Sequence, residues 1–193
     1  LAGVFTDRAY GGNQLAVLPD AAGLADAQMH AIAREFNLAE TTFVTQGSAP
    51  GHWRVRIFTP ANELPFAGHP IVGTAVALQS LGRTTGGETT LELNVGAVRV
   101  VLGGGRATFF RDGPPEYLVV PEAAGDIAAL VGAETLAATP FQAGYGTTFL
   151  QVPLADRAAV AAVAREKLDL VGIAVHGPRN AVDKVLRGAV LHG

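Results

Sequence analysis

The fold is decided by the stretch FAGHPIVGTAVALQSL, which occupies residues 66–81. Residues 70–81 contain no charged side chain, and they read as a helix with Pro70 at its first position and Gly82 as its stop. A helix that is apolar on nearly every side lies inside a protein rather than on its surface. The sequence therefore predicts a core in which other elements enclose the helix 70–81.

Short strands are predicted on both sides of this helix. In residues 52–58, Trp53, Val55 and Ile57 alternate with polar residues, which is typical of a strand with one buried face. Further strands are expected at residues 2–5, 14–18, 41–45, 89–95, 97–102 and 106–110. The glycines at 103–105 predict a hairpin turn rather than a phosphate-binding loop, because no helix follows them.

An amphipathic helix is predicted over residues 26–36, with Asp26 as its N-cap. Its apolar stripe consists of Met29, Ile32, Ala33 and Phe36. This spacing indicates a helix that packs one face against the core.

The second half of the chain has a different pattern. After a linker at Pro114 and Pro115, it predicts helices near 122–131 and 155–166, and strands at 147–153, 170–175 and 182–192. None of these helices is apolar on all sides. The second half therefore lacks an equivalent of the helix 70–81.

Composition excludes several classes of protein. The chain has 193 residues, of which 49% are hydrophobic and 16% charged, so it can bury enough apolar surface to fold. The net charge of -3 argues against a nucleic-acid binder. No apolar run reaches the roughly 18 residues that a membrane span needs, and the N-terminus does not read as a signal peptide. We expect a cytoplasmic protein that acts on a small molecule.

Several kinds of catalytic site are also disfavoured. The chain has no cysteine, which excludes disulfides, thiolate metal sites and cysteine nucleophiles. Its five histidines do not share a helix face at the spacing of metal ligands. No glycine-rich motif opens a helix after a strand, so we expect no dinucleotide cofactor.

The start of the buried helix is the first candidate site. Free backbone N–H groups and the positive end of the helix dipole meet there, and these favour a carboxylate or phosphate. Gly68 allows a ligand to approach closely, and His69 adds an imidazole that can exchange a proton. The alternative is a helix cap with a hydrogen-bonded histidine.

Three further polar residues are candidates. Glu40 lies between the helix 26–36 and the next strand, where it either faces a cleft or lies in a surface turn. Asn13 offers a donor and an acceptor to a substrate, or is simply tolerated in a turn. Glu63 either orients His69 or caps its own loop.

The order of the motifs resembles a known family. The sequence reads VFTDR at residues 4–8, AIAREFNLAETTFV at 31–44, RIFTP at 56–60 and ELPFAGHP at 63–70. These motifs resemble the PhzF-like isomerases, relatives of the phenazine biosynthesis protein PhzF. The resemblance implies an α+β, diaminopimelate epimerase-like fold with two pseudo-symmetric lobes, each a curled sheet around a central helix.

The resemblance also implies a chemistry. Glu40 and His69 would be catalytic, with Glu40 as the general acid/base. Asn13, Gly68 and Pro70 would bind the substrate. The reaction would be a cofactor-independent proton transfer at carbon of a small amino-acid-like or carboxylate substrate, in a homodimeric protein. Epimerases of this fold use two thiols, so without cysteine only the carboxylate version is open to this chain.

The second half departs from the family pattern. The family motif that opens a second central helix does not occur, and a block is missing around residues 176–180. We expect a first lobe at 1–112, an incomplete second lobe at 113–181, and a terminal strand at 182–193 that returns to the first lobe. Two interpretations follow: a PhzF-like isomerase, or a non-catalytic remnant of the fold that binds a partner or has a structural role.

Overall fold

The computed structural model describes residues 1–110, 116–121, 124–145, 147–163, 173–176 and 189–191. The chain divides into two compact units. Unit 1 consists of Leu1–Asp112 together with Arg187–Gly193, and unit 2 consists of Gly113–Leu186. Among the described residues, no helix is long and apolar enough to span a membrane.

Unit 1 is built on a nine-stranded mixed sheet. Its strands are β1 (Ala2–Val4), β2 (Asn13–Leu18), β3 (Glu40–Gln46), β4 (His52–Phe58), β5 (Glu63–Leu64), β6 (Glu88–Leu93), β7 (Gly96–Gly103), β8 (Arg106–Phe110) and β13 (Ala189–Leu191). The order is β13-β1-β2-β3-β4-β6-β7-β8, with β5 paired to β4. The β2–β3 and β4–β6 pairs are parallel, and the other pairs are antiparallel.

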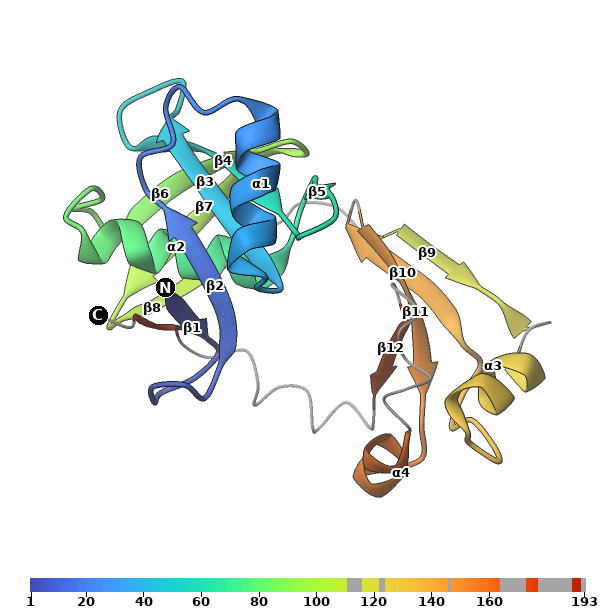
Figure 1. Cartoon of the computed structure of the whole chain (residues 1–193). Helices are drawn as coiled ribbons and strands as arrows, with labels where there is room; N and C mark the ends of the chain where they lie inside the picture. Colours follow the sequence, from blue (N-terminus) through green and yellow to red (C-terminus); the bar gives the residue numbers. More distant parts are fainter. Residues whose placement is uncertain (111–115, 122–123, 146, 164–172, 177–188, 192–193) are drawn as a thin grey trace. The chain divides into compact units, whose positions relative to one another are not determined.

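The helix α2 (Gly68–Ser80) lies inside this sheet, and its residues from His69 to Leu78 are all buried. It contacts β1 and β13 at one end of the strand order and β8 at the other, so the sheet curls around it (Figure 1). The predicted buried helix is confirmed. Its predicted start at Pro70 is wrong, because Ala67 is the N-cap and Pro70 is the third helical residue. Proline is tolerated there, since N–H groups of the first turn have no partner within the helix.

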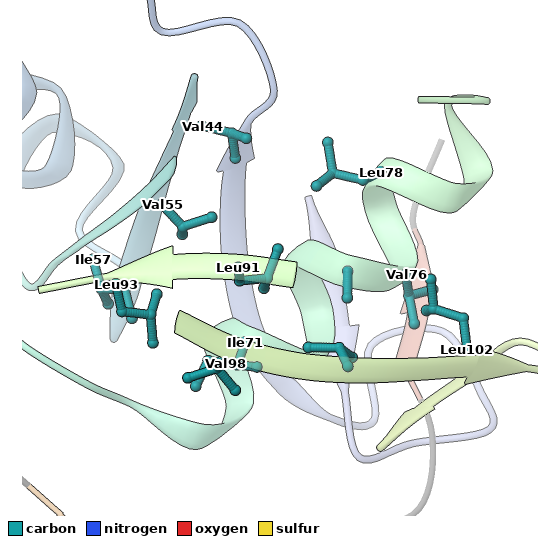
Figure 2. Packing of buried hydrophobic residues seen from close by; sticks show 12 residues of the cluster. Val44, Val55, Ile57, Ile71, Val76, Leu78, Leu91, Leu93, Val98 and Leu102 are labelled. Carbon is teal, nitrogen blue, oxygen red and sulfur yellow. The ribbon is translucent and has the colours of Figure 1, made fainter. Parts of the chain in front are cut away.

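The main core lies between α2 and the concave face of the sheet (Figure 2). Ile71 and Leu78 on the helix meet Val44, Val55 and Ile57 on the strands, and all five are at most 1% exposed. Full burial of one such side chain is worth roughly 1.5–3 kcal/mol. Because successive strand residues point to opposite faces, this core fixes the register of β3 and β4.

The helix α1 (Asp26–Phe36) covers the other face of the same strands. Met29 and Ala33 are buried against Phe43 and Phe58. The predicted role of Asp26 as N-cap is wrong. The N-cap is Ala25, whose N–H donates to Oε1 of Gln28 at 2.9 Å.

The last residue of the predicted stripe also differs from expectation. Phe36 is 44% exposed, because it ends the helix next to a left-handed residue, Asn37.

The β7–β8 hairpin agrees with the turn predicted from the sequence. Gly103 pairs with Arg106, so Gly104 and Gly105 form a two-residue turn, and both have positive φ angles of 58° and 71°.

Unit 2 contains a smaller, four-stranded sheet. Its elements are β9 (Glu116–Val119), α3 (Ala124–Val131), β10 (Phe141–Tyr145), β11 (Thr147–Pro153), α4 (Arg157–Ala162) and β12 (Ile173–His176), with strand order β12-β11-β10-β9. A core cluster that includes Ile127, Val131 and Val152 joins α3 to the sheet. In the described part of unit 2, neither helix is buried on all sides.

Several predictions for the second half hold and others fail. The strand at 147–153 is confirmed. The helix predicted at 155–166 is shorter, because Asp156 caps its start and Val163 leaves the helical conformation. The sequence does not predict the strands β9 and β10. The four residues of β9 are all exposed, so buried and exposed positions do not alternate along this strand. Residues 177–188, including most of the proposed missing block, lie outside the described residues.

Candidate active site

Two elements of unit 1 bring Glu40 and His69 together. Glu40 is the first residue of β3, and His69 is the second residue of α2. Glu40 and Thr42 point to the same face of β3, because strand side chains alternate. The Thr42 hydroxyl lies 2.9 Å from that of Thr74 on α2, and both residues are fully buried. This buried hydroxyl pair holds the helix in register with the strand that carries Glu40.

Glu40 and His69 face each other within the protein. Oε2 of Glu40 lies 3.1 Å from Nε2 of His69, and the two side chains are 17% and 8% exposed. Within the part of the chain that the structure describes, neither atom makes a hydrogen bond of good geometry, although both are buried. Buried polar atoms are normally satisfied. Two buried polar atoms left without a hydrogen bond mark a position where a further polar group can bind.

Asn13 contacts the other side of the His69 ring. Its Nδ2 lies 3.1 Å from Nδ1 of His69. Asn13 is an exposed residue at the start of β2, whereas the imidazole is buried. The amide therefore reaches from the rim of the site to the ring. The sequence placed Asn13 near the substrate but gave no sign of this contact.

The start of α2 has no capping side chain. Its N-cap is Ala67, and its first turn carries no acidic residue. Gly68 and His69 supply backbone N–H groups in this turn, whereas Pro70 has none and is buried. The uncapped end is thus suited to an anionic group.

Gly68 is not required by packing. A methyl group added there would meet, among the described residues, only the ring of Phe109, at an ordinary contact distance of 3.7 Å. The rings of Phe66 and Phe109 lie edge to face beside this end of the helix, with centroids 5.9 Å apart. Gly68 therefore leaves space at the helix start, although the packing around it does not require a glycine.

Glu63 pairs with Arg56, which differs from the expectation that it orients His69. Both of its carboxylate oxygens accept hydrogen bonds from Arg56, at 2.8 and 2.7 Å, and Asn94 donates a further one. Asp26 also pairs with Arg56, at 2.6 Å. The suggestion that Glu63 orients His69 is therefore wrong. Among the described residues, Asn13 contacts that ring through a hydrogen bond, and Glu40 faces its other nitrogen.

The Arg56–Glu63 pair gives unit 1 a pH-dependent stability. The hydrogen bonds from Arg56 hold the pKa of Glu63 below its ordinary value of 4.5. The pair therefore stabilises the fold fully above that value and loses its effect as the pH falls through the lower pKa of the folded state. We expect Glu63→Gln to lower the free energy of unfolding by up to about 1 kcal/mol at neutral pH. Denaturant titrations should show this difference vanishing in acid, and a difference that persists there would contradict the pairing.

The described residues contain no group of three or more His, Asp or Glu side chains that would hold a metal ion. The site that they do form consists of a carboxylate, an imidazole, an amide and an uncapped helix start. A sheet curled around a buried helix, with this site at the helix start, defines an α+β protein of the diaminopimelate epimerase-like fold class.

The amino-acid sequence identifies the family to which the chain belongs. Residues 2–182 match the family of phenazine biosynthesis-like proteins, PhzC-PhzF, and the chain belongs to that family. The resemblance drawn from the motifs is thereby confirmed, as is the predicted fold class.

Curated relatives match the chain over part of its length. An uncharacterized isomerase of Mesorhizobium japonicum is 54% identical over 98 residues, which cover 50% of this chain and 32% of the relative. A trans-2,3-dihydro-3-hydroxyanthranilate isomerase of Pseudomonas fluorescens is 60% identical over 67 residues, or 35% of this chain and 24% of the relative. The matched region thus spans a third or less of these relatives.

Solved structures match over more of the chain. A predicted epimerase from Pseudomonas aeruginosa superposes with a TM-score of 0.74 at 32% identity, covering 92% of this chain and 68% of that one. A PhzF-family protein of Bacillus anthracis has a TM-score of 0.72 at 26% identity, covering 82% of this chain and 56% of that one.

Proposed function

We propose that this chain carries an isomerase site that moves a proton between carbon atoms of a small carboxylate substrate. Glu40 is the general acid/base, and His69 is the catalytic group beside it. One observation carries the proposal: a half-buried carboxylate and a buried imidazole face each other 3.1 Å apart, and the two facing atoms are buried without a hydrogen bond. Membership of a family with members named as isomerases supports it.

The proton balance of the reaction is simple. The Glu40 carboxylate takes a proton from a substrate carbon, and the electron pair of that C–H bond delocalises into the adjacent unsaturated system. The carboxylic acid then returns a proton to a different carbon of the same molecule. Substrate and product are isomers, so the reaction needs no oxidant, reductant or cofactor.

In this proposal, the substrate carboxylate binds at the start of α2. There the N–H groups of Gly68 and His69 and the positive end of the helix dipole attract an anion. The reacting carbon then lies near His69, in the first turn of α2, and near Glu40, which faces His69 from the start of β3. Direct substrate contacts by Asn13 and Pro70 stay predictions, as do the homodimer and the cytoplasmic location.

Gly68 offers a clean test of this binding mode. Because Gly68→Ala meets no close neighbour, we expect its free energy of unfolding to stay within about 0.5 kcal/mol of the wild-type value. The added methyl group would lie 3.7 Å from the Phe109 ring and narrow the space at the helix start, so in this binding mode the dissociation constant for substrate should rise about tenfold or more. Calorimetric titration would measure this change. Unchanged affinity would contradict a carboxylate at the helix start.

The function itself is tested with the compound for which one of the relatives is named. The protein is incubated with trans-2,3-dihydro-3-hydroxyanthranilate, and the isomeric product is followed by chromatography. Formation of an isomer of unchanged mass supports the proposal. Binding of this compound or of related carboxylates without conversion would contradict it and favour the non-catalytic remnant.

A further inference from the structure

We propose that Asn13 is a positioning residue that fixes the tautomer of His69. It places the ring proton on Nε2, so that the imidazole presents an N–H to Glu40 and not a lone pair. The consequence for catalysis rests on the proposed function, but the tautomer itself is a property of the resting protein. This role differs from direct binding of the substrate.

The amide contact requires a particular form of the ring. The Nδ2 group of asparagine can only donate hydrogen bonds. At 3.1 Å from Nδ1 of His69, it requires a lone pair on that nitrogen. A neutral imidazole with a lone pair on Nδ1 carries its proton on Nε2.

The carboxylate on the other side of the ring favours the same form. Nε2 of His69 lies 3.1 Å from Oε2 of Glu40. With the proton on Nε2, a donor faces a carboxylate oxygen. With the proton on Nδ1, two lone pairs would face each other inside the protein, and two donors would face each other at Asn13. The hydrogen bond from Asn13 therefore selects the tautomer, and the proximity of the Glu40 carboxylate to Nε2 favours the same form, although those two atoms do not form a hydrogen bond of good geometry.

The backbone around Asn13 is held firmly enough to position a side chain. Asn13 pairs with Val4 in the β1–β2 ladder. The preceding residue, Gly12, lies so close to β1 that an added Cβ would be 2.4 Å from the carbonyl oxygen of Val4. The amide thus projects from a fixed strand end and not from a free loop.

This arrangement assigns different tasks to the two catalytic groups. A neutral His69 whose Nδ1 is engaged and whose Nε2 carries a proton is a hydrogen-bond donor toward the site. The carboxylate of Glu40 is then the only one of the two that can accept a proton from carbon. Asn13 determines which group is the base without needing to touch the substrate.

Nitrogen NMR of the resting protein tests the tautomer directly. The chemical shifts of the two ring nitrogens distinguish a protonated nitrogen from an unprotonated one, and His69→Gln identifies the His69 signals among the five histidines. We expect Nε2 protonated and Nδ1 unprotonated in the wild type. A proton on Nδ1 in the wild type would overturn the proposal, and this measurement needs no variant at position 13.

Asn13→Asp then tests the cause. Its carboxylate can only accept, so the Nδ1 signal should change to that of a protonated nitrogen, and kcat should fall about tenfold or more with little change in KM. Gln14→Glu is the matched control. It adds the same charge one residue along β2, on the opposite face, and should leave the His69 signals unchanged.

The outcomes separate this proposal from the proposed function. If Asn13→Asp leaves the Nδ1 signal as in the wild type and only raises KM, Asn13 is a substrate ligand and the positioning role is wrong. If the tautomer responds as expected in a protein that converts no substrate, the positioning role stands and the isomerase proposal fails.

Discussion

Glu40→Gln is expected to lower the rate of substrate conversion by about 100- to 10,000-fold, the usual contribution of a general acid/base. The amide has the size of the carboxylate, and its oxygen can still face Nε2 of His69, which lies 3.1 Å from Oε2 in the wild type. It cannot accept a proton from carbon. The loss should therefore appear in kcat, with substrate affinity and the free energy of unfolding nearly unchanged.

Glu35→Gln is the matched control for this variant. Glu35 is an exposed carboxylate on α1, so the change removes the same charge near the surface without touching the site. We expect its kcat to equal that of the wild type. A Glu40→Gln rate within a few fold of the wild-type rate would show that another group carries the proton.

Gly12→Ala is expected to have the largest effect on stability. Its Cβ would lie 2.4 Å from the carbonyl oxygen of Val4 and 2.7 Å from Cγ2 of Thr6, and both Val4 and Thr6 are buried. Because backbone cannot yield as the end of a side chain can, β1 and β2 must separate. We expect a loss of about 2–3 kcal/mol in the free energy of unfolding, at the upper end of the usual range for overpacking.

The same change should impair the site, because Asn13 follows directly. Displacement of its backbone removes the amide from Nδ1 of His69. Gly103→Ala is the control, since a Cβ there meets nothing within 4 Å. Chemical denaturation and the His69 nitrogen spectrum would measure both effects. A Gly12→Ala protein as stable as Gly103→Ala would contradict the close approach of this loop to β1.

The buried helix was predictable from sequence because its physical cause is local. An uncharged run from Pro70 to Leu81 can only be stable when enclosed, and α2 is enclosed. The sequence predicts its start two residues late, because Pro70 suits the first helical position, whereas proline is tolerated throughout the first turn. The strand β9, in contrast, was not predictable, because its residues are all exposed and buried positions do not alternate with exposed ones.

The candidate site was predictable only in part. Local features singled out Glu40 and His69 separately, but their contact depends on the packing of β3 against α2, which no local pattern encodes. The Thr42–Thr74 hydroxyl pair was missed for the same reason. The sequence does contain one signal, because Thr42 is two residues after Glu40 and therefore shares its face of a strand.

Asn13 and Glu63 show how proximity in sequence can mislead. Glu63 lies six residues before His69 in the chain but is bound to Arg56. Asn13 is far from His69 in sequence but contacts its ring. The residue that positions the imidazole is thus supplied by strand pairing, through the β1–β2 ladder.

Deuterium incorporation during turnover tests the role of Glu40 as a proton carrier most directly. The protein is incubated with trans-2,3-dihydro-3-hydroxyanthranilate in deuterated water, and the product is examined by mass spectrometry and NMR. Glu40 carries the substrate's proton only within a turnover, so deuterium enters the product to the extent that this acid proton, on a side chain that is 17% exposed, exchanges with solvent before it is returned to carbon. We expect deuterium at the carbon that gains hydrogen, and none in the absence of turnover. Product that Glu40→Gln forms as fast as the wild type and with the same deuterium content, or no product at all with the wild type, would contradict proton transfer by the Glu40 carboxyl.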